Sequence, residues 1–301
     1  MADVIHAPRG RALFKELPAR PSIDRTTLDS AAIGEIARDV GFWRRCWSYT
    51  PLRRFLVLVF LGCAWEIYAR LAGNPLMFPS LSDTLVAWAT DIANGTLTSA
   101  VWTSLRILVL GYGVAVLLAA VLTTLAISTR IGTDLLATLT AMFNPLPAIA
   151  ILPLALLWFG LGVQSLIFVI VHSVLWAVSL NTFTGFLSVS QTQRMVGRNY
   201  GLGGLRLVTH ILIPAAFPSI LAGLKIGWAF AWRTLIAAEL VFGVSGDSAG
   251  LGWYIFQNRN ALETAHVFAG LFTVIIIGLV IEGVVFRSIE AATVRRWGMQ
   301  A

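Results

Sequence analysis

Charge is scarce in this sequence, and its scarcity argues against a soluble protein. Of the 301 residues, 12% are charged and 57% are hydrophobic, whereas a typical soluble domain has about 25% charged residues. A soluble protein with so few charges could not cover its surface, and a disordered chain would be far less apolar. Together with a mean hydropathy of +0.79, this composition predicts an integral membrane protein with several spans.

Lysine is almost absent, and this excludes one way of using ATP. A P-loop ends in Gly-Lys followed by Ser or Thr, because the lysine must reach the phosphates of the nucleotide. The chain has two lysines, Lys15 and Lys225, which are followed by Glu16 and Ile226. We therefore predict no cofactor in this chain, and we expect any ATP and Mg²⁺ used in its work to bind to a partner chain.

Patterns of catalytic or metal-binding residues are also missing. Cys46 and Cys63 lack the spacing of a metal site or a disulfide framework, and the four histidines are scattered along the chain. Gly111 and Gly113 lie in an apolar run and continue into no dinucleotide-binding motif, so we interpret them as small residues that allow close helix packing. We predict no catalytic and no metal-binding residues, so the chain is not expected to be an enzyme.

Six apolar stretches are long enough to cross a bilayer, which takes about 20 residues per helix. Residues Leu135–Gln193 contain no Asp, Glu, Lys or Arg, and Gly160–Gln164 divides them into two spans. We expect no signal peptide, because no short apolar segment precedes Phe55. The predicted spans are 55–71, 101–127, 135–159, 165–187, 215–241 and 266–286. The predicted parts are an extension with an interfacial anchor (1–54), a transmembrane domain (55–287) and a tail (288–301).

The distribution of positive charge predicts the orientation, because Lys and Arg favour cytoplasmic loops. With the N-terminus in the cytoplasm, the inner segments hold 17 Lys and Arg and the outer segments hold one, Arg259. Both termini are therefore predicted to lie in the cytoplasm, as in bacterial inner-membrane proteins, and the net charge of +7 requires no nucleic acid. The aromatic and basic run Trp43–Tyr49 fits an interfacial anchor, and an RNA-binding patch is the alternative.

One polar segment between the fourth and fifth spans carries a distinctive motif. Met195-Val196-Gly197 precedes Gly201, and Pro214 follows after twelve more residues. This pattern resembles the cytoplasmic loop of bacterial ABC importer permeases, in which Glu-Ala-Ala, a glycine and a proline occur at this spacing. The sequence departs from that loop because Met195-Val196-Gly197 replaces Glu-Ala-Ala. The resemblance covers residues 51–298, and Asn144–Gly160, Ala237–Glu239 and Gly250–Trp253 resemble the nitrate, sulfonate, taurine and bicarbonate branch.

The resemblance implies an all-α fold, that of type I ABC importer permeases, with six transmembrane helices. It implies as partners two ATP-binding subunits, a second permease copy in a homodimer and a periplasmic solute-binding protein, in a lipid bilayer and without nucleic acid. Residues 188–212 would form the loop that couples transport to the ATPase. The implied coupling residues are Arg194, Met195, Val196, Gly197, Arg198, Gly201 and Pro214.

The composition of this loop supports a docking role on physical grounds. Arg194 and Arg198 are spaced i, i+4, and apolar residues such as Met195 and Tyr200 lie between or beside them. A short helix of this kind, with the small Gly201 at its end, could lie across the membrane plane and fit a groove in a partner. The alternative is an ordinary connection between two spans.

The fifth span contains a stripe of polar and aromatic residues. At 100° per residue, Lys225, Trp228, Trp232 and Glu239 lie within about 60° of one another, and Arg233 lies about 80° from Lys225. Ionisable residues in a span usually face the bundle interior or a wet cavity, so the stripe is a candidate solute pathway. Two cations against one acid favour an anionic solute. In the alternative, Lys225 reaches the cytoplasmic surface and the tryptophans are interface anchors.

The third span contains Pro145, Pro147 and Pro153, which remove backbone donors and kink a helix. Such breaks often lie where a helix lines a cavity, although a structural kink is equally plausible. We predict a permease subunit of an ATP-driven importer for a small anionic solute such as nitrate, an alkanesulfonate, taurine or bicarbonate. The alternative is a stand-alone ion-coupled secondary transporter, which inverted repeats with discontinuous helices would favour.

Overall fold

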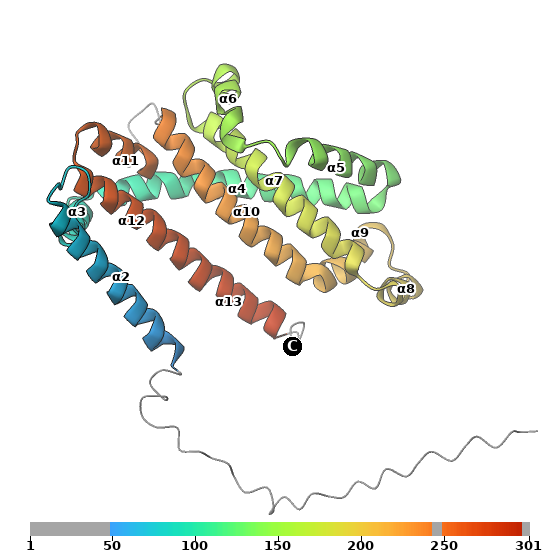
Figure 1. Cartoon of the computed structure of the whole chain (residues 1–301). Coiled ribbons are helices and arrows are strands. Elements are labelled where there is room, and N and C mark those ends of the chain that lie inside the picture. The colour runs from blue at the N-terminus through green and yellow to red at the C-terminus, as the bar shows by residue number, and fades with distance from the viewer. Residues whose placement is uncertain (1–48, 243–248, 297–301) are drawn as a thin grey trace, which may run out of the picture. The chain divides into compact units, whose positions relative to one another are not determined.

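The computed structural model describes residues 49–242 and 249–296, which form helices joined by short connections (Figure 1). The chain divides into two compact units, Met1–Leu58 and Val59–Ala301. Apart from residues 50–58 at the start of the first helix, the features described below belong to the second unit. The predicted anchor at residues 43–48 and most of the predicted N-terminal extension lie outside the described residues.

Within the described residues, five helical segments are long and apolar enough to cross a membrane. They are α2 (Thr50–Ala72), α4 (Thr96–Ser128), α7 (Val163–Ser188), Gly204–Val241 with α10 (Ile213–Phe242), and Thr264–Arg295, which begins with α12 (Thr264–Val280). A sixth span results if the bent pair Arg130–Phe143 and Ala148–Phe159 is counted as one crossing. The all-helical fold is confirmed, and the predicted six spans are reached when the bent pair is counted as one crossing.

The third span is broken where the sequence predicted a kink. Helix α5 (Arg130–Phe143) ends before Asn144, and η1 (Ala148–Ile151) with α6 (Leu152–Phe159) continues at an angle of 87°. Pro145 and Pro147 explain the break, because each removes a backbone donor and disfavours helical geometry in the residue before it. Pro153 breaks nothing, since it lies in the first turn of α6, where a helical N–H has no intrahelical partner.

The core is built where α7 packs against α10 and α4 (Figure 1). Small residues allow this approach: a Cβ atom on Gly111 would lie 3.0 Å from Cγ2 of Ile170, and one on Gly223 would lie 2.7 Å from Cβ of Asn181. Close backbone approach gives van der Waals packing, which drives helix association in lipid. The packing interpretation is therefore confirmed at Gly111, whereas nothing lies within 4 Å of a Cβ placed on Gly113.

Two short helices lie between the predicted spans, in segments for which the sequence predicted no element. They are α3 (Leu81–Ala93) and α11 (Leu251–Asn260). Ser80 caps α3 by accepting a hydrogen bond from the backbone N–H of Asp83 at 3.0 Å. Glu66 of α2 accepts a second one from the N–H of Ser82 at 3.1 Å, which ties α2 to the start of α3.

The last helix is longer than predicted. The sequence placed the end of the sixth span at Phe286, but helical structure continues through η3 (Ile281–Phe286), α13 (Arg287–Glu290) and η4 (Ala291–Arg295). Most of the described part of the predicted tail is therefore a continuation of this helix.

Candidate functional site

The predicted coupling loop contains a well-defined short helix, α8 (Gln191–Asn199). Ser190 caps its start by accepting a hydrogen bond from the N–H of Gln193 at 3.3 Å. In Figure 1, α8 is seen nearly end-on, whereas α7 and α10 are seen lengthwise in the plane of the picture, so α8 lies crosswise to both. The predicted helix across the ends of the spans is therefore present in this segment.

Arg194 fastens α8 to the preceding span. Its guanidinium donates to the carbonyl oxygen of Phe186, and its Nε donates to that of Val189 at 3.3 Å. These carbonyls lie at the C-terminal end of α7, where the last turn of a helix leaves acceptors free and where positive charge is favourable. The structure thus places Arg194 in an internal bond that orients α8.

Gly197 lies on the buried side of α8. A Cβ atom there would approach Cδ1 of Leu207 to 2.8 Å and Cγ1 of Ile211 to 3.0 Å, so only glycine fits without a shift. Leu207 ends the short helix α9 (Gly204–Leu207), and Ile211 lies in the π-helical turn η2 (Val208–Leu212). The glycine that stands in place of the second alanine of the family motif is therefore a packing residue.

The end of α8 explains the glycine at position 201. Gly201 has φ +73°, its N–H donates to the carbonyl oxygen of Arg198 at 2.9 Å, and the N–H of Leu202 donates to that of Gly197 at 3.0 Å. Together these bonds form a Schellman motif, which ends a helix with a residue in the left-handed conformation. Glycine reaches this conformation at no steric cost, which explains why it stands at this position.

The outward side of the loop presents apolar and basic side chains. Met195, Val196 and Tyr200 are 54%, 46% and 82% exposed, and Arg198 is exposed as well. A shallow cavity of about 340 Å³ lies beside them, and Val196 and Pro214 both contribute to its wall. The structure therefore brings together two predicted coupling residues that are far apart in the sequence.

The stripe of the fifth span largely faces one cavity. Lys225, Trp228, Trp232 and Arg233 line a cavity of about 520 Å³ between α10 and the last helix, which we call the α10–α12 cavity. Lys225 Nζ lies 2.6 Å from Oε2 of Glu290, and Trp232 Nε1 donates to the carbonyl oxygen of Val274 at 3.2 Å. Four of the five predicted pathway residues thus share a face, as the helical periodicity indicated.

Glu239, the fifth predicted pathway residue, has a different environment. Its side chain is fully buried (0% exposed), 2.8 Å from the Ser104 hydroxyl, and accepts a hydrogen bond from the N–H of Gly252 at 2.9 Å. The Ser104 hydroxyl in turn accepts from the N–H of Leu251 at 2.8 Å. Glu239 and Ser104 therefore satisfy two free N–H groups at the start of α11 and join α4, α10 and α11. Glu239 lines neither the α10–α12 cavity nor the cavity described next.

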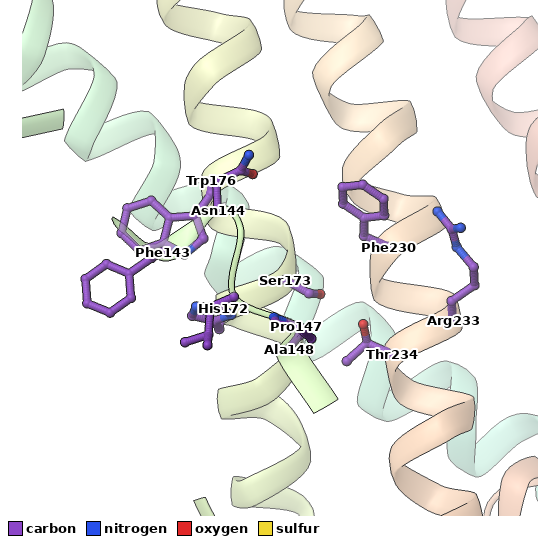
Figure 2. A pocket seen from close by; sticks show the side chains of 11 residues that line it. Phe143, Asn144, Pro147, Ala148, His172, Ser173, Trp176, Phe230, Arg233 and Thr234 are labelled. Atoms are coloured by element: carbon purple, nitrogen blue, oxygen red, sulfur yellow. The ribbon is translucent and has the colours of Figure 1, made fainter. Parts of the chain in front are cut away.

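A second cavity lies at the break in the third span, and we call it the break cavity. It measures about 310 Å³, and it is walled by residues of the break and by parts of α7 and α10 (Figure 2). Its polar wall residues are Asn144, His172, Ser173, Trp176, Arg233 and Thr234. In Figure 2, Ser173 of α7 faces Phe230 and Thr234 of α10 across the space between these helices. A cavity therefore lies beside the proline-rich break, which is one of the two interpretations that the sequence left open.

The sequence indicated only part of the break cavity. Its prolines marked the break, and Arg233 belonged to the predicted stripe. His172 and Trp176 were missed, because a single polar residue in an apolar helix has no pattern that distinguishes a cavity wall from the core. The available signal was spacing, since residues at i and i+4 share a helix face.

Comparison with known proteins places most of the described residues in one family. Residues 111–295 match the profile of the family described as "Binding-protein-dependent transport system inner membrane component". A probable ABC transporter permease protein of Brucella melitensis is 30% identical over 225 residues, which cover 75% of this chain and 88% of that protein.

Two further relatives have names that include a solute. The nitrate import permease protein NrtB of Synechocystis is 30% identical over 182 residues, covering 60% of this chain and 65% of that protein. The taurine transport system permease protein TauC of Escherichia coli K12 is 33% identical over 141 residues, covering 47% of this chain and 50% of that protein. The nitrate, sulfonate and taurine branch suggested by the sequence thus agrees with these similarities.

Proposed function

The chain belongs to the family of binding-protein-dependent transport system inner membrane components, and from this membership we propose how it works within its importer. It is a multi-pass permease subunit of an ABC importer rather than a stand-alone ion-coupled transporter. The match over residues 111–295 carries this conclusion. Members of this family are transporter permeases and are not themselves catalytic. We therefore propose that a partner ATPase binds ATP and Mg²⁺ and performs the hydrolysis.

We propose that α8 is the segment that docks on the ATPase. Its outward residues Met195, Val196 and Arg198 supply the contact, while Arg194, Gly197 and Gly201 hold the helix in place. The exposed apolar side chains on this surface, together with its motif spacing, support the assignment, because solvent-exposed Met and Tyr beside Arg are typical of interface residues. Pro214 would contribute to coupling by forming, together with Val196, part of the wall of the cavity beside α8.

We further propose a bacterial inner-membrane location, with both termini and α8 in the cytoplasm. The basis is the charge asymmetry of 17 to one between the predicted inner and outer segments. In the proposed assembly, two copies of this chain form a homodimer that binds two ATPase subunits and receives solute from a periplasmic binding protein.

We propose a small anion as the solute. Arg233 faces both cavities and has no carboxylate partner within the described residues, whereas the charge of Lys225 is compensated by Glu290. Uptake by relatives named for taurine and nitrate is consistent with this class. Among the pathway residues predicted from sequence, Arg233 is therefore expected to influence anion passage most.

Co-expression of this chain with a candidate ATPase and binding protein encoded beside it tests the proposal. The tagged chain should retain the ATPase during purification, and uptake in proteoliposomes should require ATP and vanish when the P-loop lysine of the ATPase is replaced. Uptake by the chain alone, driven by a proton or sodium gradient, would instead support the secondary transporter.

A further inference from the structure

The break cavity has the charge and donors of an anion site. None of the residues that line it is acidic, and Arg233 contributes a positive charge. Both ring nitrogens of His172 and Nε1 of Trp176 are buried and have no hydrogen-bond partner among the described residues. Trp176 is only 8% exposed. A buried donor without a partner is costly, so a ligand that accepts from it gains binding energy.

The α10–α12 cavity lacks this character, although it also contains Arg233. Glu282 lies in its wall, and Glu290 pairs with Lys225 at 2.6 Å. Two acids therefore accompany the two cations around this cavity, whereas the wall of the break cavity contains Arg233 and no acid. Of the two cavities on α10, the break cavity is the one that attracts an anion.

The wall of the break cavity also contains aromatic rings. Phe143 and Trp176 are stacked, with centroids 5.3 Å apart and planes 12° from parallel, and the Arg233 guanidinium lies over the Phe230 ring at 5.1 Å. Figure 2 shows the guanidinium curving back from α10 towards Phe230. Such rings can contact the apolar part of an organic ligand, whereas a bare inorganic ion has no apolar part for them to contact.

The size of the break cavity also favours an organic anion over a bare inorganic one. A volume of about 310 Å³ is at the lower end of the range for small-molecule sites, which is roughly 300–1,000 Å³. A bare trigonal oxyanion would leave most of this space unfilled, whereas a short organic chain or one ring beside an anionic group would occupy it.

We propose that the break cavity binds a small organic anion, with a sulfonate or carboxylate head at Arg233 and an apolar body against the aromatic wall. Trp176 and His172 carry unpartnered nitrogens in the α7 part of the wall, and the Asn144 amide lies in the same wall. The inference rests on the proposed function, since it assigns the solute class and a binding position within the permease. It separates an organosulfonate or carboxylate importer from one for nitrate.

Titration calorimetry on the full chain in lipid nanodiscs tests the site. The probes are butanesulfonate, nitrate and butylammonium, which vary the body and the charge of the ligand separately. We expect butanesulfonate to bind roughly tenfold or more tightly than nitrate, and butylammonium not to bind. Equal or tighter binding of nitrate would overturn the organic class, and no binding of butanesulfonate to the wild-type chain would overturn the site.

Two substitutions and a control connect the binding to this cavity. Arg233→Gln should weaken butanesulfonate binding roughly tenfold or more, because a charge-assisted hydrogen bond is lost. Trp176→Phe keeps an aromatic ring and removes the Nε1 donor, so it should weaken binding about threefold to tenfold. Arg106→Gln removes an exposed cation of α4 that does not line the cavity and should change nothing. Unchanged affinity in both cavity variants would overturn the proposal.

Retention of the ATPase, measured on the same preparations, separates the two hypotheses. If wild type and Arg233→Gln both retain the ATPase but bind butanesulfonate equally well, the site is wrong and the importer function stands. If butanesulfonate binding depends on Arg233 while no ATPase is retained, the site stands and the coupling proposal is wrong.

Discussion

Substitution of Gly201 gives the sharpest test of the coupling helix, because its cost is set by backbone geometry alone. Gly201 has φ +73°, and nothing lies within 4 Å of a Cβ atom placed there. A new side chain therefore meets no clash, and its only penalty is the left-handed conformation. That penalty is about 1–2 kcal/mol for an ordinary L-residue, and a β-branched residue is a more severe outlier.

The expected effects form a ranked series. Gly201→Asn should be nearly neutral, because asparagine tolerates this conformation, whereas Gly201→Ala should cost about 1 kcal/mol. Gly201→Val should cost about 1–3 kcal/mol, and 2 kcal/mol would lower the equilibrium constant for forming the native turn roughly thirtyfold. Because the Schellman bonds hold the end of α8, losing them should release or uncouple the ATPase while the spans still insert.

Gly203 is the matched control in the same loop. Its φ is −138°, in the extended region, and nothing lies within 4 Å of a Cβ atom placed on it. Gly203→Val should therefore leave ATPase retention and uptake unchanged. The readouts are the amount of ATPase that co-purifies with the tagged chain and uptake in proteoliposomes. If Gly201→Val transports normally, or if both valine variants are equally damaging, the Schellman turn does not determine coupling.

Three further predictions follow from the same structure. In a cysteine-free background, a cysteine at Asn94 should label from the periplasm and one at Gln191 should not; the reverse pattern would invert the proposed orientation. Glu239→Ala should lower the detergent melting temperature, since it unpairs a buried N–H at a cost of about 1–3 kcal/mol; an unchanged melting temperature would show that the junction is not stabilising. Lys225→Ala should reduce uptake less than Arg233→Gln, because its charge is already compensated; equal losses would assign both cations to the pathway.

Local patterns in the sequence predicted the features that depend on neighbouring residues. Long apolar runs gave the spans, and the spacing from Met195 to Pro214 gave α8 and the turn at Gly201. The continuous third span was predicted less well. Pro145 and Pro147 indicated a kink, but the extent of the bend depends on how the two halves pack against α7, which no local pattern contains.

The environment of each ionisable residue could not be predicted from sequence, because it depends on partners far along the chain. Periodicity placed Lys225, Arg233 and Glu239 on similar faces of one helix, and nothing in the pattern distinguished them. Glu239 bonds to Ser104, 135 residues away, and Lys225 bonds to Glu290, 65 residues away, so structural contacts occupy both.

Arg233 Nε donates to the carbonyl oxygen of Ala229, and its guanidinium lies over a ring, so its charge remains uncompensated by any carboxylate in the described chain. An uncompensated charge in a span is energetically costly, so such residues usually mark functional sites. This charge borders the break cavity, whose wall contains no acid. Of the three ionisable residues of the stripe, the structure therefore leaves Arg233 as the one whose charge is free to act on a passing anion.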